Sequence, residues 1–383
     1  MLGHSRVSQK PDIIIVGAGI VGAACAMECA RAGLRTLVLE RECVGGGTTA
    51  AGMGHIVAMD DSEAQFALTR YSRNLWIQMR PQLPEEAEYD PCGTLWVAAD
   101  DEEMTEVRRK QNFFEQRGVR VEMLDSDGVA KAEPQLRPGL SGGLLVPDDA
   151  VVYPPCAAKF FLDQARTLGA EIKMGVAATH LLPEGGVRLA DGTHLSADRV
   201  INVAGPWSPE LMPGVPVRKR KGHLVITDRA PGFVRHQIVE LGYLKSAHSV
   251  SKDSVAFNVQ PRKTQQVLVG SSRQFDAAST EVDHAILSRM LSRAGEYLPG
   301  LNDLVAIRTW TGHRPATPDK LPLIGPSLFS DRIWLATGHE GLGITTSLGT
   351  GRLLADLLLG QPTEIPSEPF SPSRYANGAS HHE

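Results

Sequence analysis

Short apolar runs and one alanine-rich segment alternate at the start of the chain. Asp12–Val16 and Thr36–Glu40 are short apolar runs and are predicted to be strands. The alanine-rich segment Ile20–Ala32 between them is predicted to be a helix that ends at Gly33. The chain is therefore predicted to open with a strand–helix–strand unit.

The same order of strand and helix recurs further along the chain. Leu144–Val146, Glu171–Lys173 and Arg199–Ala204 are predicted strands, and Pro155–Leu168 is a predicted helix. We expect these segments to extend one parallel sheet that begins with the first unit.

Two other stretches have the alternating pattern of an antiparallel sheet. They run from about Cys92 to Pro147 and from about His223 to Ile307. The predicted strands are Thr94–Ala98, His223–Thr227, Ser254–Val259 and Val267–Gly270, and the predicted helices are Asp101–Arg117 and Val282–Leu298. This second pattern indicates a separate domain.

Because the two patterns interleave, the predicted fold is an α/β domain combined with an antiparallel-sheet domain, between which the chain crosses several times. Residues 11–91, 148–222 and 307–365 are assigned to a Rossmann-like domain, and residues 92–147 and 223–306 to the antiparallel-sheet domain. Residues 366–383 are rich in serine and proline and are expected to form a loose tail.

Composition narrows the classes of function. Of the 383 residues, 42% are hydrophobic and 22% charged, and the net charge of −5 leaves no excess of Lys or Arg for a phosphate backbone. A small molecule is therefore favoured over a nucleic acid as the ligand. The polar start of the chain lacks a secretory signal and no apolar run suits an integral membrane span, so a cytoplasmic protein is expected. The five cysteines form no CxxC pair, which favours reduced structural thiols, and no metal site is predicted.

Three glycines with the spacing GxGxxG lie between the first strand and the first helix. Gly17 allows a tight turn, Gly19 allows a pyrophosphate to approach the backbone N–H groups, and Gly22 allows the helix to pack closely on the strand. Glu40, at the end of the next strand, is placed to accept hydrogen bonds from ribose hydroxyls. Together these residues predict a dinucleotide site.

NAD and FAD share the ADP half that the GxGxxG turn recognises, so other segments must distinguish the two cofactors. Small residues run from Gly45 to Met53, and Thr337–Ile344 joins a predicted strand, Ile333–Ala336, to a predicted helix over Thr345–Leu359. The start of a helix suits the anionic edge of a reduced flavin, because its N–H groups are unpaired and carry partial positive charge. An NAD enzyme has no need of this second site, so FAD is the predicted cofactor.

Two further segments, Asn202–Ser208 (NVAGPWS) and Trp310–Asp319 (WTGHRPATPD), complete a set of five motifs. With them the chain resembles the D-amino-acid oxidase superfamily of FAD enzymes over nearly its whole length. Within it, the chain is similar to glycine oxidase, D-amino-acid dehydrogenase and the β-subunits of hydroxyproline or opine dehydrogenases. The resemblance implies oxidation of the C–N bond of an amino acid or N-substituted amino acid to an imine, by hydride transfer to flavin N5. It also implies that the antiparallel sheet covers the isoalloxazine.

The predicted cofactor contacts combine glycines of the motifs with residues that the resemblance adds. The motif glycines are Gly17, Gly19, Gly22, Gly205 and Gly312. The resemblance adds Ile20, Val21, Glu40, Arg41, Thr48, Thr49, Ala51, Gly52, Met53, the backbone near Ala178, and His339, Glu340, Gly341, Leu342, Gly343, Ile344 and Thr345. FMN at an interface with a partner subunit is kept as a second flavin candidate.

Arg314 is the residue predicted to bind the substrate. The family's WxGxRP segment places an arginine over the flavin, and a guanidinium fork stays charged and pairs with both oxygens of a carboxylate. Gly312 occupies the place of the cysteine that carries the flavin in the sarcosine-oxidase branch, so the FAD is expected to be non-covalent.

Other departures from the family concern the substrate and the electron acceptor. Glycine oxidases carry a second arginine where this chain has Gly341 and a tyrosine where it has Asn258, which implies a wider and different pocket. The GHEGxG form of the last loop resembles dehydrogenase β-subunits that work beside a second flavoprotein. A partner flavoprotein or quinone in a hetero-oligomer is therefore expected to take the electrons.

His55, His339 and Glu340 are the remaining candidates for catalysis. Hydride transfer needs a neutral amine and good alignment rather than a protein base, so the histidines are expected to be hydrogen-bonding partners. Glu340 either favours a cationic or secondary amine or only caps the helix. Three alternatives stay open: an oxidase that uses oxygen, a flavin-bearing interaction subunit with little chemistry of its own, and an NAD-dependent dehydrogenase.

Overall fold

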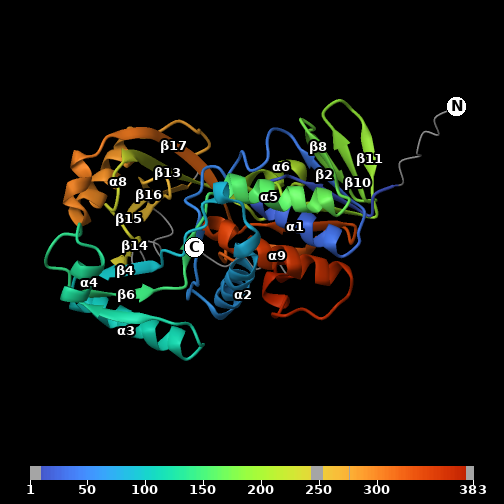
Figure 1. Cartoon of the computed structure of the whole chain (residues 1–383). Helices are drawn as coiled ribbons and strands as arrows, with labels where there is room; N and C mark the ends of the chain where they lie inside the picture. The colour runs from blue at the N-terminus through green and yellow to red at the C-terminus, as the bar shows by residue number, and fades with distance from the viewer. Residues whose placement is uncertain (1–9, 243–252, 276, 377–383) are drawn as a thin grey trace.

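A parallel sheet forms one half of the protein. The structure is a computed structural model that describes residues 10–242, 253–275 and 277–376 (Figure 1). Five neighbouring strands of this sheet are parallel, and the edge strand β18 runs antiparallel to β19. In sheet order the strands are β18 (Leu323–Pro326), β19 (Ile333–Thr337), β12 (Arg199–Asn202), β1 (Ile13–Val16), β2 (Thr36–Glu40) and β8 (Glu171–Met174).

Helices cover one face of this sheet. Ile13, Ile15 and Val38 belong to the core that these helices share. The helices are α1 (Ile20–Arg31), α2 (Glu63–Met79), α5 (Pro154–Thr167) and α9 (Gly343–Leu358). Small residues let them approach closely, since a Cβ added to Gly351 of α9 would lie 2.8 Å from the Ala24 carbonyl oxygen of α1.

The opposite face of the parallel sheet carries its own apolar core. Ile14, Val16 and Leu37 pack there against Leu181 and Val187 of a small three-stranded sheet. Alternate residues of one strand thus serve both faces, which is why the buried strand is apolar throughout. The small sheet has the order β11 (His194–Ser196), β10 (Gly186–Leu189) and β9 (Ala178–Leu182), and the short helix α6 (Ser208–Leu211) lies beside it.

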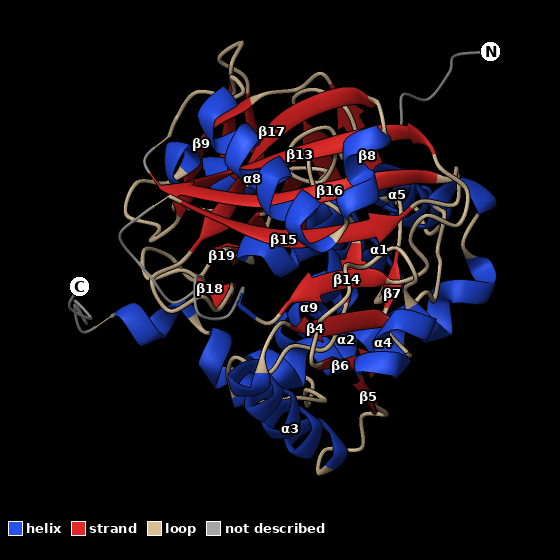
Figure 2. Ribbon diagram, turned by 90° about the vertical axis from the view of Figure 1, so that its left-hand side faces the viewer, coloured by secondary structure: helices blue, strands red, loops and turns tan. Residues whose placement is uncertain are grey.

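The second half of the protein is an eight-stranded sheet, antiparallel except for the β14–β4 pair (Figure 2). Its order is β17 (Ala306–Ala316), β13 (Arg218–Arg229), β16 (Gln266–Phe275), β15 (Ser254–Pro261), β14 (Gln237–Glu240), β4 (Thr94–Ala98), β6 (Gly142–Val146) and β5 (Glu122–Asp125). The remaining elements are α3 (Asp101–Glu115), α4 (Ser126–Ala132), α8 (His284–Tyr297) and the strand pair β3 (His55–Ile56) and β7 (Ala150–Val151).

The two faces of this larger sheet differ in character. Val225, Phe257 and Val269 point to the face that α8 covers and form a core with its Met290. Their neighbours along the strands, such as Leu224 and Asn258, line a cavity on the other face, as the period of two in a strand requires. The cavity face is therefore free to carry polar side chains.

One predicted strand belongs to a different sheet from the one expected. Leu144–Val146 was expected in the parallel sheet, whereas β6 pairs with β4 and β5 in the eight-stranded sheet. A short apolar run carries no information about its partner strand. In the structure β6 lies close to β4, since a Cβ added to Gly143 would lie 2.4 Å from the Trp96 carbonyl oxygen.

The predicted boundaries cut through two strands of the larger sheet. β13 spans the boundary between residues 222 and 223, and residues 307–316, assigned by sequence to the Rossmann-like part, lie in β17 of the eight-stranded sheet. Both strands belong wholly to the eight-stranded sheet, so the predicted boundaries do not coincide with its strand ends. The division into domains itself stays a prediction.

The segment 366–376 is packed rather than loose, which corrects the expectation for this part of the tail. Short 3₁₀ turns occupy Glu368–Phe370 and Pro372–Tyr375, and Phe370 is only 1% exposed. The Arg374 Nε atom donates to Asp319 Oδ2 at 2.6 Å. Residues 377–383 lie outside the described part.

Helices that could cross a membrane are not found. Over residues 10–242, 253–275 and 277–376, no helix combines sufficient length with sufficient apolar character.

Candidate functional site

A cavity of about 480 Å³ lies where the two halves meet. Residues that follow β1 and β2, among them Gly17 and Arg41, line one part of it. Gly312, Arg314 and Glu340, from β17 and the segment before α9, line another part. The cavity therefore connects the two glycine-rich segments that the sequence singled out.

The first glycine turn is shaped by close backbone contacts. Gly17 has a φ of 117°, and a Cβ there would lie 2.9 Å from the Val203 carbonyl oxygen. A Cβ on Gly22 would lie 2.2 Å from the Gly17 carbonyl oxygen, so α1 can start only if residue 22 is glycine. The N-cap residue Gly19 has no side chain to bond the helix start, and the Ile20 amide instead donates to Thr49 Oγ1 at 3.0 Å.

Glu40 stands at the end of β2 beside this turn. Its Oε2 accepts from the Ala18 amide at 2.7 Å and its Oε1 from the Glu42 amide at 2.9 Å, so its carboxylate is held in place. Arg41 follows it, and the Arg41 Cζ atom lies 4.5 Å from the centre of the Trp207 ring. Ala178, which only the family resemblance pointed to, lines the same cavity.

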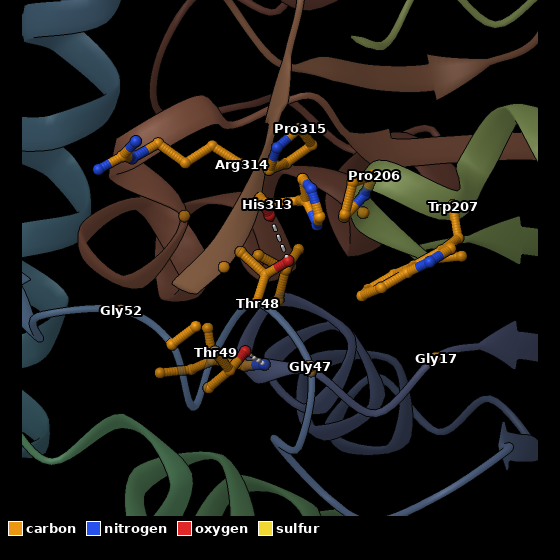
Figure 3. Close-up of a pocket in the computed structure, with 18 of the residues that line it drawn as sticks. Gly17, Gly47, Thr48, Thr49, Gly52, Pro206, Trp207, His313, Arg314 and Pro315 are labelled. Carbon is orange, nitrogen blue, oxygen red and sulfur yellow. Dashed lines mark hydrogen bonds between the residues drawn. The ribbon is translucent and has the colours of Figure 1, made fainter. Parts of the chain in front are cut away.

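The loop from Gly45 to Met53 is fixed to both halves. Thr48 Oγ1 donates to the His313 carbonyl oxygen at 2.7 Å, as Figure 3 shows. A Cβ on Gly312 would lie 2.3 Å from the Cβ of Ala51, so the loop and β17 are in close contact. The small residues of this loop therefore serve both the cavity and its junction with β17.

The start of α9 also opens on the cavity. Its N-cap is Leu342, and no side chain caps the helix. Gly341, Gly343 and Ile344 line the cavity, as do Gly19, Ile20 and Val21 from the start of α1. Two helix starts, each with partial positive charge, thus face one space.

His339 is buried beneath this loop. Its Nε2 lies 3.0 Å from Thr350 Oγ1, and burial lowers the pKa of His339 to about 3. The imidazole is therefore neutral, and its contact in the structure is with Thr350.

His55 lies at the edge of the cavity, next to the substrate candidate Arg314. Burial lowers the pKa of His55 to about 4, with a contact from Gln260 opposing this and the charge of Arg314 adding to it. Among the described residues, no group hydrogen-bonds to His55 Nε2. His55 is thus a neutral, buried imidazole beside the cavity.

Glu340 is paired rather than acting as a cap. Its carboxylate forms an ion pair with Arg220, and both side chains are largely buried. Because the N-cap of α9 is Leu342 without a side-chain bond, the alternative that Glu340 caps this helix is wrong. The Arg220 pair also lowers the negative charge that Glu340 presents to a ligand.

Arg314 lies over the backbone of the neighbouring strand β13. Its Nη1 donates to the Ser272 carbonyl oxygen at 3.0 Å, and a Cβ on Gly222 would lie 2.5 Å from the same nitrogen. Gly222 therefore leaves the room that the guanidinium occupies. In Figure 3, Arg314 extends away from Trp207.

Three predicted cofactor residues do not line this cavity. Gly22 acts through packing, as described above, and Leu342 lines a smaller cavity next to the first. Thr345 is fully buried, and its Oγ1 donates to the His55 carbonyl oxygen at 2.8 Å. The predicted residues that do line the cavity are Gly17, Gly19, Ile20, Val21, Glu40, Arg41, Thr48, Thr49, Ala51, Gly52, Met53, Ala178, Gly205, Gly312, His339, Glu340, Gly341, Gly343 and Ile344, with His55 and Arg314.

Several lining residues were not predicted as site residues. Trp207 stood in a quoted motif, and Asn258 stood out as a departure from the oxidases, so both carried a signal in the sequence. Gly222, Leu224 and Ser271 carried none, because only the pairing of β13, β16 and β17 brings them to the cavity.

The lining fits a flavin dinucleotide. Gly17 and Gly312 let their backbones lie close to Val203 and Ala51 at the cavity wall, and the starts of α1 and α9 offer N–H groups to a pyrophosphate and to an anionic ring edge. A single helix start would suit an ADP group alone.

His339 provides a pH prediction. Because its pKa is about 3 in the folded protein and about 6.5 when unfolded, the unfolded chain binds a proton first as the pH falls. The free energy of unfolding should therefore fall by about 1.4 kcal/mol per pH unit below pH ~6.5 through this group. His339→Gln lacks this titrating group, so its free energy of unfolding should not fall with pH in this way. The difference in free energy of unfolding between wild type and His339→Gln, measured by denaturant titration, should therefore decrease from pH ~6 to ~4.5. His194→Gln, at an exposed position, is the control, and parallel curves for wild type and His339→Gln would contradict the assignment.

Known proteins resemble the chain over nearly its whole length. Residues 12–357 match the protein family described as FAD dependent oxidoreductase, DAO. The chain is 27% identical to hydrogen cyanide synthase subunit HcnC of Pseudomonas aeruginosa over 96% of this chain and 97% of that protein. It is 30% identical to a D-amino acid dehydrogenase of Xanthobacter autotrophicus over 82% of this chain and 74% of that protein. The crystal structure of glycine oxidase from Geobacillus kaustophilus has the same fold, with a TM-score of 0.85 at 24% identity over 96% of this chain and 99% of that one.

Proposed function

Because the chain belongs to the DAO family of FAD-dependent oxidoreductases, which act on the C–N bonds of amino acids, we propose that it is an amino-acid dehydrogenase with a partner protein as electron acceptor. Its substrate would be an amino acid or N-substituted amino acid of the D-amino acid, hydroxyproline or opine type, which is oxidised to an imine. The observation that carries the proposal is the single cavity that joins the two glycine segments to Arg314.

The cofactor would be non-covalent FAD held at both ends of the cavity. Gly17, Gly19 and the start of α1 would bind the pyrophosphate, and Glu40 the ribose. The start of α9 would face the flavin ring. When bound, FAD supplies the acceptor for a hydride from the carbon beside the substrate nitrogen.

The chain's own residues would position the substrate and control its protonation. Arg314 would pair with the carboxylate through its guanidinium fork. Hydride loss from the carbon requires a neutral amine, and a cation at Arg314 together with buried surroundings disfavours a charged ammonium. His55, neutral at pH 7, would accept or donate one hydrogen bond at the cavity wall and need not remove a proton.

A partner protein is favoured by two sequence features and one relative. Gly341 and Asn258 depart from the glycine-oxidase pattern, and Glu340 follows the pattern of dehydrogenase β-subunits. HcnC is itself named as a subunit of a synthase. FMN at an interface with that partner belongs to the same proposal.

The electron acceptor is tested with the isolated chain. With an amino acid that bleaches its flavin anaerobically, turnover with an artificial dye should greatly exceed turnover in air, because the proposed acceptor is a protein cofactor and not oxygen. Dye reduction and peroxide release are measured side by side with the same substrate and enzyme stock.

Anaerobic dye reduction serves as the control for flavin content and substrate. Peroxide released in stoichiometric amount with the imine-derived product would support the second candidate, an oxygen-using oxidase of the glycine oxidase kind.

A further inference from the structure

A second cavity, of about 120 Å³, adjoins the first. The two cavities share Arg314 and Gly341 among their lining residues. Of the described residues outside its own turn, only Arg314 would lie within 4 Å of a Cβ added to Gly341, at 3.9 Å. The space beside Gly341 is therefore open, and a ligand held at Arg314 has room to extend from the first cavity into the second.

Apolar side chains form much of the wall of the second cavity. The apolar residues that line it are Val57, Met59, Trp96, Val239 and Leu342. Trp96 and Val239 are buried and belong to an apolar core, against which Met59 packs. The second cavity is thus bounded in part by the edge of an apolar core.

Strand register brings two of these side chains to one face of the larger sheet. Trp96 of β4 lies opposite Val239 of β14, and Val239 lies opposite Asn258 of β15, which lines both cavities. Their neighbours along the strands, Leu95 and Ile238, belong instead to the core that α8 covers. The wall of the second cavity therefore continues the wall of the first.

The arginines at the second cavity have partners of their own. Arg220 forms an ion pair with Glu340. Arg314 Nη1 donates to the Ser272 carbonyl oxygen, and Arg273 also has an interaction of its own. In the proposed function, Arg314 is in addition reserved for the carboxylate that every amino acid carries. A further charged group on the substrate would therefore compete with existing contacts of these arginines.

The other polar groups do not favour a charged ligand either. Asp61 is exposed and Lys320 is half-buried, and their opposite charges leave no net charge between them. The amide oxygens of Gln65 and Gln237 are enclosed by the protein, so these acceptors do not face the cavity. Burial lowers the pKa of His55, which lines both cavities, to about 4, so a positive charge is disfavoured at this wall. The second cavity therefore suits an uncharged group.

We propose that the second cavity receives an uncharged aliphatic arm of the substrate, so that the enzyme prefers amino acids with such an arm over glycine and over amino acids with a second charge. This inference rests on the proposed function, in which Arg314 holds the substrate carboxylate. The arm would contain roughly four carbon atoms, since an apolar cavity of about 150 Å³ holds benzene. Its methylene groups would leave water on binding, which stabilises the complex.

The test uses the FAD-loaded enzyme and carboxylates that lack an amine and cannot be oxidised. Acetate, propionate, butyrate, pentanoate and hexanoate are titrated while the flavin absorption band is followed. Each added methylene should strengthen binding roughly two- to fourfold until the second cavity is full. Pentanoate should bind at least about tenfold more tightly than glutarate, which has the same number of carbon atoms but a second charge.

Two variants that fill the second cavity test its location. Val239→Phe and Met59→Phe each add bulk at its wall, so the ratio of hexanoate affinity to acetate affinity should fall at least about fivefold in each. Val305→Phe is the matched control, because Val305 is 61% exposed and lines neither cavity, and its ratio should equal that of wild type. Flavin content shows that each variant is folded, and Met59→Phe keeps the test valid if the larger side chain at the buried Val239 prevents folding.

Isomeric amino acids show which atom of the substrate carries the arm. D-norleucine, L-norleucine and N-butylglycine have the same atoms, and each is mixed anaerobically with the enzyme while reduction of the flavin is followed. At least one of them should reduce the flavin at least about tenfold more efficiently than glycine. A norleucine places the arm on the α-carbon and N-butylglycine places it on the nitrogen. No advantage over glycine for any of the three would overturn the inference.

Failure of this inference and failure of the proposed function give different results. Equal affinity for acetate and hexanoate, or tighter binding of glutarate than of pentanoate, would overturn the aliphatic subsite, while loss of acetate binding in Arg314→Ala would still support the carboxylate site. Absence of binding by every carboxylate would overturn both ideas. An unchanged ratio of hexanoate affinity to acetate affinity in both phenylalanine variants of the cavity wall would overturn the location of the subsite.

Discussion

Arg314→Ala is expected to lower kcat/KM by roughly 30- to 5,000-fold, which corresponds to about 2–5 kcal/mol for the loss of a buried charge partner. The substrate carboxylate would lose the guanidinium fork and remain in a site shielded from water. Steady-state kinetics with the best substrate of an anaerobic panel measure the effect. Arg314→Lys keeps the charge but loses the fork, so its kcat/KM should lie between the values of wild type and Arg314→Ala.

Arg308→Ala is the matched control, because Arg308 lies on the same strand, β17, at an exposed position. It should keep kcat/KM near the wild-type value. The flavin absorption of every variant is recorded, so that a loss of cofactor is not taken for a loss of substrate binding. An Arg314→Ala enzyme that retains FAD and works within about twofold of wild type would remove Arg314 from the substrate site.

The sequence predicted the parts of the fold that depend on local pattern. The strand β1, the helix α1 and the strand β2 were predicted within a residue or two, because apolar runs and glycine positions are properties of neighbouring residues. The partner of β6 could not be predicted, because strand pairing depends on contacts distant in sequence. The strand β14 was missed altogether, since its four residues lack a clear alternation of polar and apolar positions.

The same limit applies to the site. The glycines and Arg314 belong to motifs with a recognisable spacing, so the sequence could single them out. In the structure, motif glycines and Arg314 line one cavity. Gln65 and Gln237 have no such spacing, and each is one polar residue in an unremarkable segment. Only the register of β14 and the position of α2 bring them to the second cavity.

Gly22→Ala is expected to abolish stable FAD binding, with an increase in the dissociation constant of at least about 100-fold. The added Cβ would lie 2.2 Å from the Gly17 carbonyl oxygen and 2.8 Å from Val203 Cγ2. Both contacts are too short, and the first is with backbone, so α1 must move away from the turn. That movement displaces the N–H groups at the start of the helix from the place where the pyrophosphate would bind. Flavin content of the purified variant, followed by titration with FAD, measures the loss.

Gly295→Ala is the matched control, since Gly295 also lies inside a helix, α8, but its added Cβ would meet only the flexible Asn302 amide, at 3.3 Å. This variant should bind FAD normally and gain up to about 1 kcal/mol in stability from the better helix propensity of alanine. Thermal shifts distinguish lost binding from misfolding, because excess FAD raises the melting temperature of wild type and Gly295→Ala by mass action. A folded Gly22→Ala protein should show no such shift. If it instead carried one FAD per chain, the turn at Gly17 would tolerate a displaced α1, and the pyrophosphate would have to be held elsewhere in the cavity.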